Sequence, residues 1–229
     1  METNQTPIIQ VRKLRKVYMM GQEHVVALHN INLDIPRGEV CCIFGTSGSG
    51  KSTLLNQLAG LEKPTHGVVR IGGVPISLLN ENQLAAFRQK HIGFVFQSYN
   101  LLPELTAAEN VAMPLMFKGI PYETRMLEAK KMLCRVGLKD RIQHFPSQMS
   151  GGQQQRVGIA RAFITRPEVV FADEPTGNLD SKTTKEVMHM IRDFAKRFHQ
   201  TIVLVSHDPE MTEYAYRIIT LIDGEIVSD

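Results

Sequence analysis

Hydrophobic and polar positions follow distinct patterns along this chain of 229 residues. Three short runs are continuously apolar, at residues 40–44, 169–172 and 202–205, which is typical of strands buried on both faces of a parallel sheet. A helical pattern follows each run, at 52–59, at 181–198 and in a helix opened by Asp208 and Pro209. The alternation of strands and helices predicts an α/β core.

Two other stretches alternate with the period of a half-buried strand. In the first 35 residues, Ile31, Leu33 and Ile35 are spaced two apart, and residues 67–76 behave similarly. Turns are predicted at residues 36–38 and at Gly72-Gly73. We therefore expect an antiparallel sheet beside the core, and a terminal hairpin of 218–222 and 225–227 around residues 223–224.

The middle of the chain is predicted to be helical. Thr106 and Glu109 have the spacing of a capping box, and Gly137 is placed to end a helix. One apolar helical face combines Met126, Ala129, Leu133 and Val136. We predict one domain over residues 1–229, in which 1–96 and 167–229 form the core with its antiparallel layer and 97–166 form an inserted helical subdomain.

Composition excludes several classes of protein. The net charge of +3 is too small and too dispersed to predict nucleic-acid binding, and the cluster Arg12, Lys13, Arg15 and Lys16 is interpreted as the solvated face of an edge strand. The apolar runs fall far short of the roughly 20 residues that span a bilayer. We expect neither a transmembrane segment nor a secretory signal, since the first residues have no basic stretch followed by an apolar one.

The cysteines indicate a reducing compartment. Three is an odd number, and the adjacent Cys41 and Cys42 lie in an apolar run, where buried thiols are expected rather than a disulfide or a metal site. This pattern is typical of the cytosol.

A glycine-rich segment carries the first candidate chemistry. Gly45-Thr46-Ser47-Gly48-Ser49-Gly50-Lys51-Ser52 matches the P-loop pattern, with Thr53 after it, between a predicted buried strand and a predicted helix. In such a loop the backbone amides surround phosphates, Lys51 supplies a positive charge and Ser52 offers a hydroxyl to Mg²⁺. A flexible Gly/Ser loop is the alternative. The pattern in this context favours nucleotide binding.

Two adjacent carboxylates follow the predicted strand 169–172. Asp173 is placed to hold Mg²⁺ through water, and Glu174 to orient or deprotonate a water that attacks a phosphate. Solvated charge at a strand end explains such a pair equally well when it is taken alone. The P-loop upstream favours the catalytic interpretation.

A second glycine-rich segment is Pro146-Ser147-Gln148-Met149-Ser150-Gly151-Gly152-Gln153-Gln154-Gln155-Arg156. Ser150 and Gln153 form a capping box, and Gly151 and Gly152 leave the first helical amides uncovered, which predicts another anion site. A capped helix alone does not explain paired glycines, each of which weakens a helix by about 1 kcal/mol. The segment closely resembles the signature motif of ATP-binding cassette (ABC) proteins, with Met149 in place of the usual Leu, an apolar exchange that we expect to leave the phosphate site intact.

The resemblance covers essentially the whole chain and implies a RecA-like P-loop NTPase core that binds ATP and Mg²⁺ and hydrolyses ATP. It implies a head-to-tail homodimer in which each signature motif faces the partner's P-loop. Tyr18 resembles the aromatic residue that stacks on adenine, Gln97 the Q-loop glutamine, His207 the switch histidine, and residues 177–180 the D-loop. Core packing or a helix cap is the ordinary explanation for Tyr18 or His207 taken singly, and their order and spacing favour the functional one.

These roles define the expected site. The expected catalytic residues are Glu174, His207 and Gln97, and the expected metal ligands are Ser52, Gln97 and Asp173. The expected nucleotide contacts are Tyr18, Gly45, Ser47, Gly48, Ser49, Gly50, Lys51, Ser52, Thr53, Ser150, Gly151, Gly152, Gln153 and Asp180.

Residues 98–103 and 173–180 resemble the subfamily of lipoprotein-releasing, macrolide-exporting, bacitracin-resistance and cell-division cassettes. This implies a separate membrane permease with a large extracytoplasmic domain, with the cassette bound to it at the cytoplasmic face of the membrane. We expect the contact surface within residues 97–114, where Tyr99, Leu101, Leu102 and Leu105 are candidate anchors or, equally, core residues. A soluble cassette without a transport role is the alternative function. It generally has two cassettes or a long coiled coil, which this sequence lacks.

Overall fold

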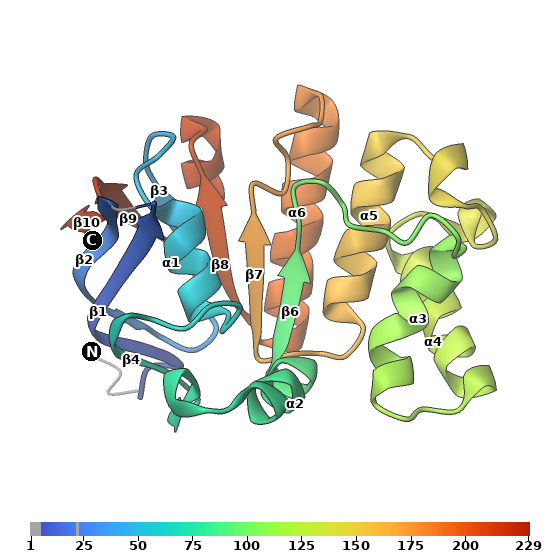
Figure 1. The fold of residues 1–229 in the computed structure, drawn as a ribbon. Helices are drawn as coiled ribbons and strands as arrows, with labels where there is room; N and C mark the ends of the chain where they lie inside the picture. Colours follow the sequence, from blue (N-terminus) through green and yellow to red (C-terminus); the bar gives the residue numbers. More distant parts are fainter. Residues whose placement is uncertain (1–5, 22) are drawn as a thin grey trace. The chain divides into compact units, whose positions relative to one another are not determined.

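The computed structural model describes residues 6–21 and 23–229, which form two compact units. The first comprises Met1–Arg88 with Thr201–Asp229, and the second comprises Gln89–Gln200 (Figure 1). The division falls inside α2 (Glu81–His91) and directly before β8 (Thr201–Ser206). The predicted helical segment 97–166 lies wholly within the second unit, and the boundaries given to it stay a prediction.

The parallel part of the first unit carries the P-loop. β3 (Val40–Phe44) pairs in parallel with β8 and with β9 (Arg217–Ile222). β10 (Glu225–Ser228) pairs antiparallel with β9, which confirms the predicted hairpin. Because every residue of β8 and nearly every residue of β3 is buried, both strands appear in the sequence as continuous apolar runs. α1 (Lys51–Leu58) follows β3.

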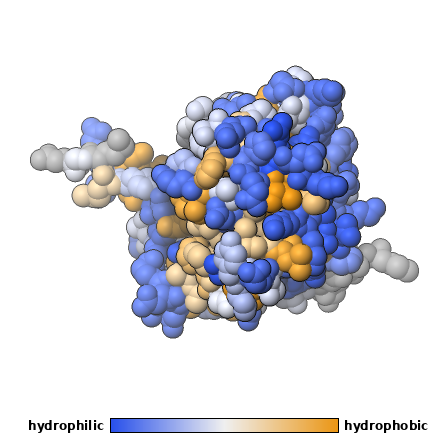
Figure 2. Space-filling view, turned by 90° about the vertical axis from the view of Figure 1, so that its right-hand side faces the viewer, coloured by the Kyte–Doolittle hydropathy of each residue, from blue (hydrophilic) through white to orange (hydrophobic). Residues whose placement is uncertain are grey.

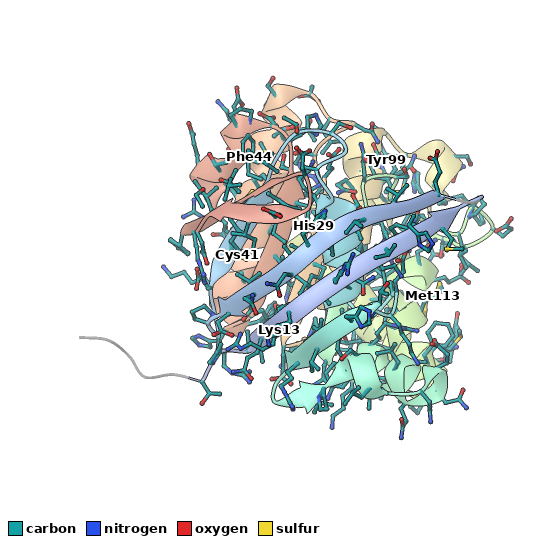
Figure 3. The ribbon with its side chains drawn as sticks, turned by 60° about the vertical axis from the view of Figure 1, so that its left-hand side comes forward. Lys13, His29, Cys41, Phe44, Tyr99 and Met113 are labelled. Carbon is teal, nitrogen blue, oxygen red and sulfur yellow. The ribbon has the colours of Figure 1, made fainter. Side chains whose placement is uncertain are left out.

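An antiparallel sheet completes the first unit, with the strand order β2-β1-β4-β5. The bounds are β1 (Ile9–Met20), β2 (Glu23–Ile35), β4 (His66–Ile71) and β5 (Val74–Pro75), and η1 (Ile76–Leu78) follows. The expectation that the basic cluster lies on an edge strand is wrong, since β1 lies between β2 and β4. Arg12 and Lys13 are exposed on β1, and Arg12 pairs with Asp34 of β2 at 2.7 Å. Figure 3 labels Lys13 on this strand.

The second unit combines two strands with helices. β6 (Ile92–Val95) pairs in parallel with β7 (Val169–Asp173). The helices are α3 (Ala107–Phe117), α4 (Tyr122–Arg135), η2 (Lys139–Arg141), η3 (Pro146–Gln148), α5 (Gly151–Phe163) and α6 (Ser181–Phe198). Thr106 and Ser150 form the two predicted capping boxes, and Gly137, with φ of 74°, follows the C-cap of α4. Local capping therefore sets these helix ends.

The predicted helix opened by Asp208 and Pro209 is present as η4 (Pro209–Tyr214), a short 3₁₀ helix. The Tyr216 amide already donates to the Val40 carbonyl at 2.8 Å, so the chain rejoins β3 after one short helical segment. Among the helices of residues 6–21 and 23–229, none combines the length and the apolar character needed to cross a membrane.

Candidate functional site

The P-loop joins β3 to α1 in the first unit. Gly48 and Gly50 have φ of +83° and +97°, a region that side chains of L-residues rarely adopt. Gly50 is the N-cap of α1, and no side chain of the described residues caps the helix there. The first amides of α1 are therefore left for an external acceptor, which fits a phosphate group.

Two P-loop glycines are also required by the protein's own backbone. A Cβ atom on Gly45 would lie 2.3 Å from the Leu221 carbonyl oxygen, and one on Gly50 would lie 2.6 Å from the Ala27 carbonyl oxygen. β9 and β2 therefore hold the two ends of the loop closely. This support from distant segments fixes the loop's shape before any ligand binds.

Two polar side chains of the loop are buried. Lys51 is 6% exposed, and its Nζ donates to the Thr46 carbonyl at 2.7 Å across the loop. The Ser49 hydroxyl is buried and has no hydrogen-bond partner within the described part of the chain. A buried hydroxyl without a partner is costly, and a bound phosphate oxygen would satisfy it. Ser52 is exposed at the start of α1, where its hydroxyl is accessible to a metal ion.

Tyr18 lies on β1 within a small polar cluster. Its hydroxyl donates to Glu62 Oε2 at 2.7 Å, and Lys16 Nζ lies 5.0 Å from the ring centroid and 3.2 Å from the same carboxylate oxygen. Burial raises the pKa of Tyr18, as does the bond to Glu62, while a hydrogen bond with Thr53 of α1 lowers it in part. The ring is therefore held in one orientation. Glu62 was not predicted, because no motif joins positions 44 residues apart, and Lys16 was interpreted only as part of the basic cluster.

His207 directly follows β8, which pairs with β3 so that Ser206 is opposite Phe44. The P-loop begins one residue after Phe44, so His207 and the P-loop follow the same edge of the parallel sheet. His207 is exposed there. Ligands of α/β proteins bind at this carboxyl edge.

In the second unit, Gln97 and the carboxylates follow adjacent strands, because Val95 of β6 is opposite Ala172 of β7. Asn178 Nδ2 donates to the Gln97 carbonyl at 3.2 Å, and a Cβ atom on Gly177 would lie 2.9 Å from Gln97 Nε2. Gln97 therefore packs against the D-loop.

Glu174 has a strained backbone. Its φ of 41° is left-handed, and its carbonyl accepts from the Gly177 amide at 3.1 Å. Such conformations in residues other than glycine are concentrated at functional sites. The tight turn that follows β7 thus fixes the carboxylate that is expected to act as the base.

The signature segment starts α5. The Ser150 hydroxyl accepts from the Gln153 amide at 3.4 Å, and Gln153 Oε1 accepts from the Ser150 amide at 3.0 Å. A pocket of about 240 Å³ lies beside this start and is lined by Gly137, Leu138, Ser150, Gly152, Gln153, Arg156 and Thr183. The helix start thus borders a polar pocket.

The paired glycines have a packing explanation that the sequence did not reveal. A Cβ atom on Gly151 would lie 2.7 Å from the Tyr99 hydroxyl, and one on Gly152 would lie 2.6 Å from Thr183 Cγ2. Tyr99 and Thr183 therefore approach the helix start as closely as glycine allows. Because Gly151 and Gly152 have no side chains, the first amides of α5 are also left uncovered.

Asp180 caps α6. It accepts from the amides of Lys182 and Thr183 at 3.1 and 3.0 Å and from the Thr183 hydroxyl at 2.6 Å. These bonds lower the pKa of Asp180, the one from the Thr183 hydroxyl most of all. A structural role at this position is therefore clear, and contact with a nucleotide stays a prediction.

The expected metal ligands are divided between the units. Ser52 belongs to the first, and Gln97 and Asp173 belong to the second. All three offer oxygen atoms, which Mg²⁺ prefers, and Mg²⁺ commonly takes few protein ligands together with water and substrate phosphates. The donor set therefore fits this ion.

The sequence is similar to known proteins of one family. A family model described as ABC transporter matches residues 28–177. The macrolide export ATP-binding/permease proteins MacB of Escherichia coli K12 and of Vibrio parahaemolyticus are each 46% identical over 222 residues. Those residues are 97% of this chain and 34% of each relative, so the chain spans about a third of the length of these curated relatives.

Solved structures show the same fold. The ATP-binding cassette MJ0796, in a dimeric post-hydrolysis state bound to ADP and Pi, superposes with a TM-score of 0.90 and 43% identity, covering 96% of this chain and 97% of that one. CbiO1 of Clostridium perfringens, part of the ABC transporter complex cbiONQ, has a TM-score of 0.86 and 27% identity, covering 98% and 88%.

Proposed function

We propose that this chain, which belongs to the ABC transporter family, binds MgATP, dimerises head-to-tail and hydrolyses ATP to drive a separate membrane permease. The observation that carries the proposal is that one chain has two glycine-rich helix starts, each of which is a candidate anion site. One is the P-loop at the start of α1, and the other is the signature segment at the start of α5. A two-fold dimer gives each nucleotide both kinds of site.

The residues divide the chemistry as follows. Tyr18 stacks on the adenine, and Lys51, the Ser49 hydroxyl and the first amides of α1 bind the phosphates. Ser52, Gln97 and Asp173 would hold Mg²⁺, which neutralises phosphate charge when bound. Glu174 accepts a proton from the attacking water, and His207 donates a hydrogen bond to the γ-phosphate.

The first experiment separates binding from hydrolysis. Lys51→Ala should abolish ATP binding, because it removes the positive charge of the P-loop. Glu174→Gln should lower turnover by roughly 10²- to 10⁴-fold, the range for loss of a general base, and leave ATP affinity unchanged. Titration calorimetry and phosphate release measure the two quantities. Unchanged ATP affinity in Lys51→Ala would contradict the P-loop assignment.

The second experiment tests the composite site. Ser150→Arg fills the signature start, so homodimers of Ser150→Arg or of Lys51→Ala have no intact site, whereas a mixed dimer has one. Mixing the two variants in equal amounts should therefore restore part of the ATPase activity. In a Glu174→Gln background, cysteines at Ser47 and Ser150 should cross-link between chains when ATP is present. A cross-link confined to single chains would contradict the head-to-tail arrangement.

A groove on the second unit supports docking of the permease. It has a volume of about 200 Å³ and is lined by Leu102, Leu105, Glu109, Ala112, Met113, Met116, Tyr122, Arg125 and Met126. Leu102, Met116, Phe117 and Tyr122 are exposed, and the face of the molecule that carries α3 and α4 shows hydrophobic patches within a hydrophilic surface (Figure 2). Tyr99 is not an anchor of this kind, since its hydroxyl lies against Gly151.

The groove is tested with a charged substitution. Met113→Asp should prevent retention of the chain on membranes that contain its permease, because a buried unpaired carboxylate is costly in an apolar contact. Val74→Asp, in the first unit, is the matched control. Retention of Met113→Asp at the level of the control would exclude this groove as the docking surface.

A further inference from the structure

The segment that follows Gln97 is strained. Tyr99 and Asn100 have φ of 61° and 47°, so two consecutive residues other than glycine are left-handed. The Asn100 amide donates to the Ser98 carbonyl at 2.6 Å, which tightens the turn. Such a backbone persists only where the surrounding structure holds it in place.

Arg161 of α5 holds this turn. Its Nη1 donates to the Asn100 carbonyl at 2.5 Å and its Nη2 to the Tyr99 carbonyl at 2.8 Å, so the planar guanidinium binds the two strained residues together. The guanidinium also lies 5.9 Å from the centroid of the Phe96 ring. Arg161 is half-buried, and burial lowers its pKa. Hydrogen bonds of a partly buried charged group are costly to break.

The Tyr99 side chain contacts the opposite end of the same helix. A Cβ atom on Gly151 would lie 2.7 Å from Tyr99 Oη and 3.6 Å from Tyr99 Cζ, and Figure 3 shows Tyr99 close to the yellow segment that leads into α5. Between these ends, a Cβ atom on Gly158 would lie 3.7 Å from the Tyr99 carbonyl. Gly151 and Arg161 lie ten positions apart in α5, so Tyr99 contacts the helix through its hydroxyl at one end and through its carbonyl nearer the other.

We propose that Tyr99 and Arg161 are positioning residues that join the Gln97 segment to the start of α5 as one rigid element. A shift of Gln97 on nucleotide or permease binding then moves the signature amides, and closure on the partner's nucleotide restrains Gln97 in return. The inference rests on the proposed function for the roles of Gln97 and the signature segment. The physical link itself does not depend on those roles.

Amide hydrogen exchange of the nucleotide-free chain tests the link directly. Tyr99→Ala removes the contact with Gly151, and we expect exchange about tenfold faster both at residues 98–101 and at Gln153 and Gln154. Tyr99→Phe keeps the ring in place and should restore slow exchange in both segments. Tyr216→Ala, at an exposed tyrosine, is the matched control. Faster exchange confined to residues 98–101 would refute the link.

ATP-driven dimerisation of Glu174→Gln tests the consequence. Arg161→Lys keeps the charge and loses the two-pronged contact, so the ATP concentration for half-maximal dimer should rise about three- to thirtyfold, the range expected for coupled residues. ATP affinity of the monomer should stay unchanged, as it should in the control Arg135→Lys on exposed α4.

Several outcomes decide between the proposals. An Arg161→Lys chain that dimerises at the same ATP concentration as the parent would overturn the positioning role. Equal losses of the monomer's ATP affinity and of dimer formation would also overturn it, because they indicate a general structural defect. A Glu174→Gln parent that stays monomeric contradicts the proposed function instead, and the exchange measurement then decides on the link alone.

Discussion

The ring of Tyr18 and its hydroxyl are expected to contribute unequally to nucleotide affinity, and two substitutions separate them. Tyr18→Ala removes the stacking surface, and base stacking on an aromatic side chain is worth about 1–3 kcal/mol. The dissociation constant for ATP should therefore rise about 5- to 150-fold. Stacking discriminates little between bases, so affinity for GTP should fall by a similar factor.

Tyr18→Phe keeps the ring and removes the hydroxyl, which bonds to Glu62 at 2.7 Å and also to Thr53. A bond to a carboxylate is worth about 1.5–3 kcal/mol when buried, but the Glu62 side chain is 35% exposed and is shared with Lys16, so most of this value is screened. The hydroxyl affects nucleotide affinity only by orienting the ring. We expect a loss of about 0.3–0.8 kcal/mol, a rise of about two- to fourfold in the dissociation constant.

Titration of a fluorescent ATP analogue measures both variants on the isolated chain. Glu62→Ala should lower the affinity at least as much as Tyr18→Phe, because it removes the same hydrogen bond and also the ion pair with Lys16. In the Tyr18→Phe background its effect should be smaller than in wild type, since the shared hydrogen bond is already lost. Glu81→Ala, an exposed carboxylate, serves as the control. The assignment of Tyr18 to the adenine would be refuted by an unchanged affinity in Tyr18→Ala. Equal losses in the Ala and Phe variants would instead place the main contribution in the hydroxyl.

Two further predictions concern other parts of the chain. Hydrogen bonds of the folded state lower the pKa of Asp180 from its usual 3.8, so its stabilising effect is full above that value and is lost as the pH falls through the lower folded pKa. Urea unfolding should therefore show wild type more stable than Asp180→Asn at about pH 6, with the difference shrinking in acid; a constant difference would contradict the cap. Burial raises the pKa of Cys41 and that of Cys42, the latter to about 12, whereas Cys134 is exposed. A thiol reagent should thus modify one cysteine in the native chain and three after denaturation, and rapid native modification of two would contradict the buried thiols.

The fold was largely predictable because its sequence patterns are local. Continuous apolar runs marked β3, β7 and β8, and the capping boxes at Thr106 and Ser150 marked the starts of α3 and α5. The limits of α6 were also predicted, because one apolar face continues to Phe198; the Asp180 cap at its start is known from the structure. Each of these features depends on residues a few positions apart, which a single sequence displays.

The basic cluster was wrongly interpreted because distant segments decide its place. Its charges suit a solvated edge strand, but the pairing of β4 with β1 makes that strand internal. The segment after Asp208 is helical as expected, and the pairing of Tyr216 with Val40 ends it after one short 3₁₀ helix. In both places long-range pairing determined what the local pattern does not show.

The glycines of the P-loop and of the signature segment show most clearly which structural requirements a sequence pattern does not reveal. At Gly48, whose added Cβ atom would meet nothing within 4 Å, only the left-handed backbone requires glycine. At Gly45, Gly50, Gly151 and Gly152 an added Cβ atom would instead collide with β9, β2, Tyr99 and Thr183 respectively. Four of these five glycines thus let other parts of the protein approach the helix starts. Glycine at these positions therefore leaves backbone amides accessible to a phosphate. It also lets other parts of the protein pack closely against the same backbone, and this packing keeps the amide donors preorganised for developing charge.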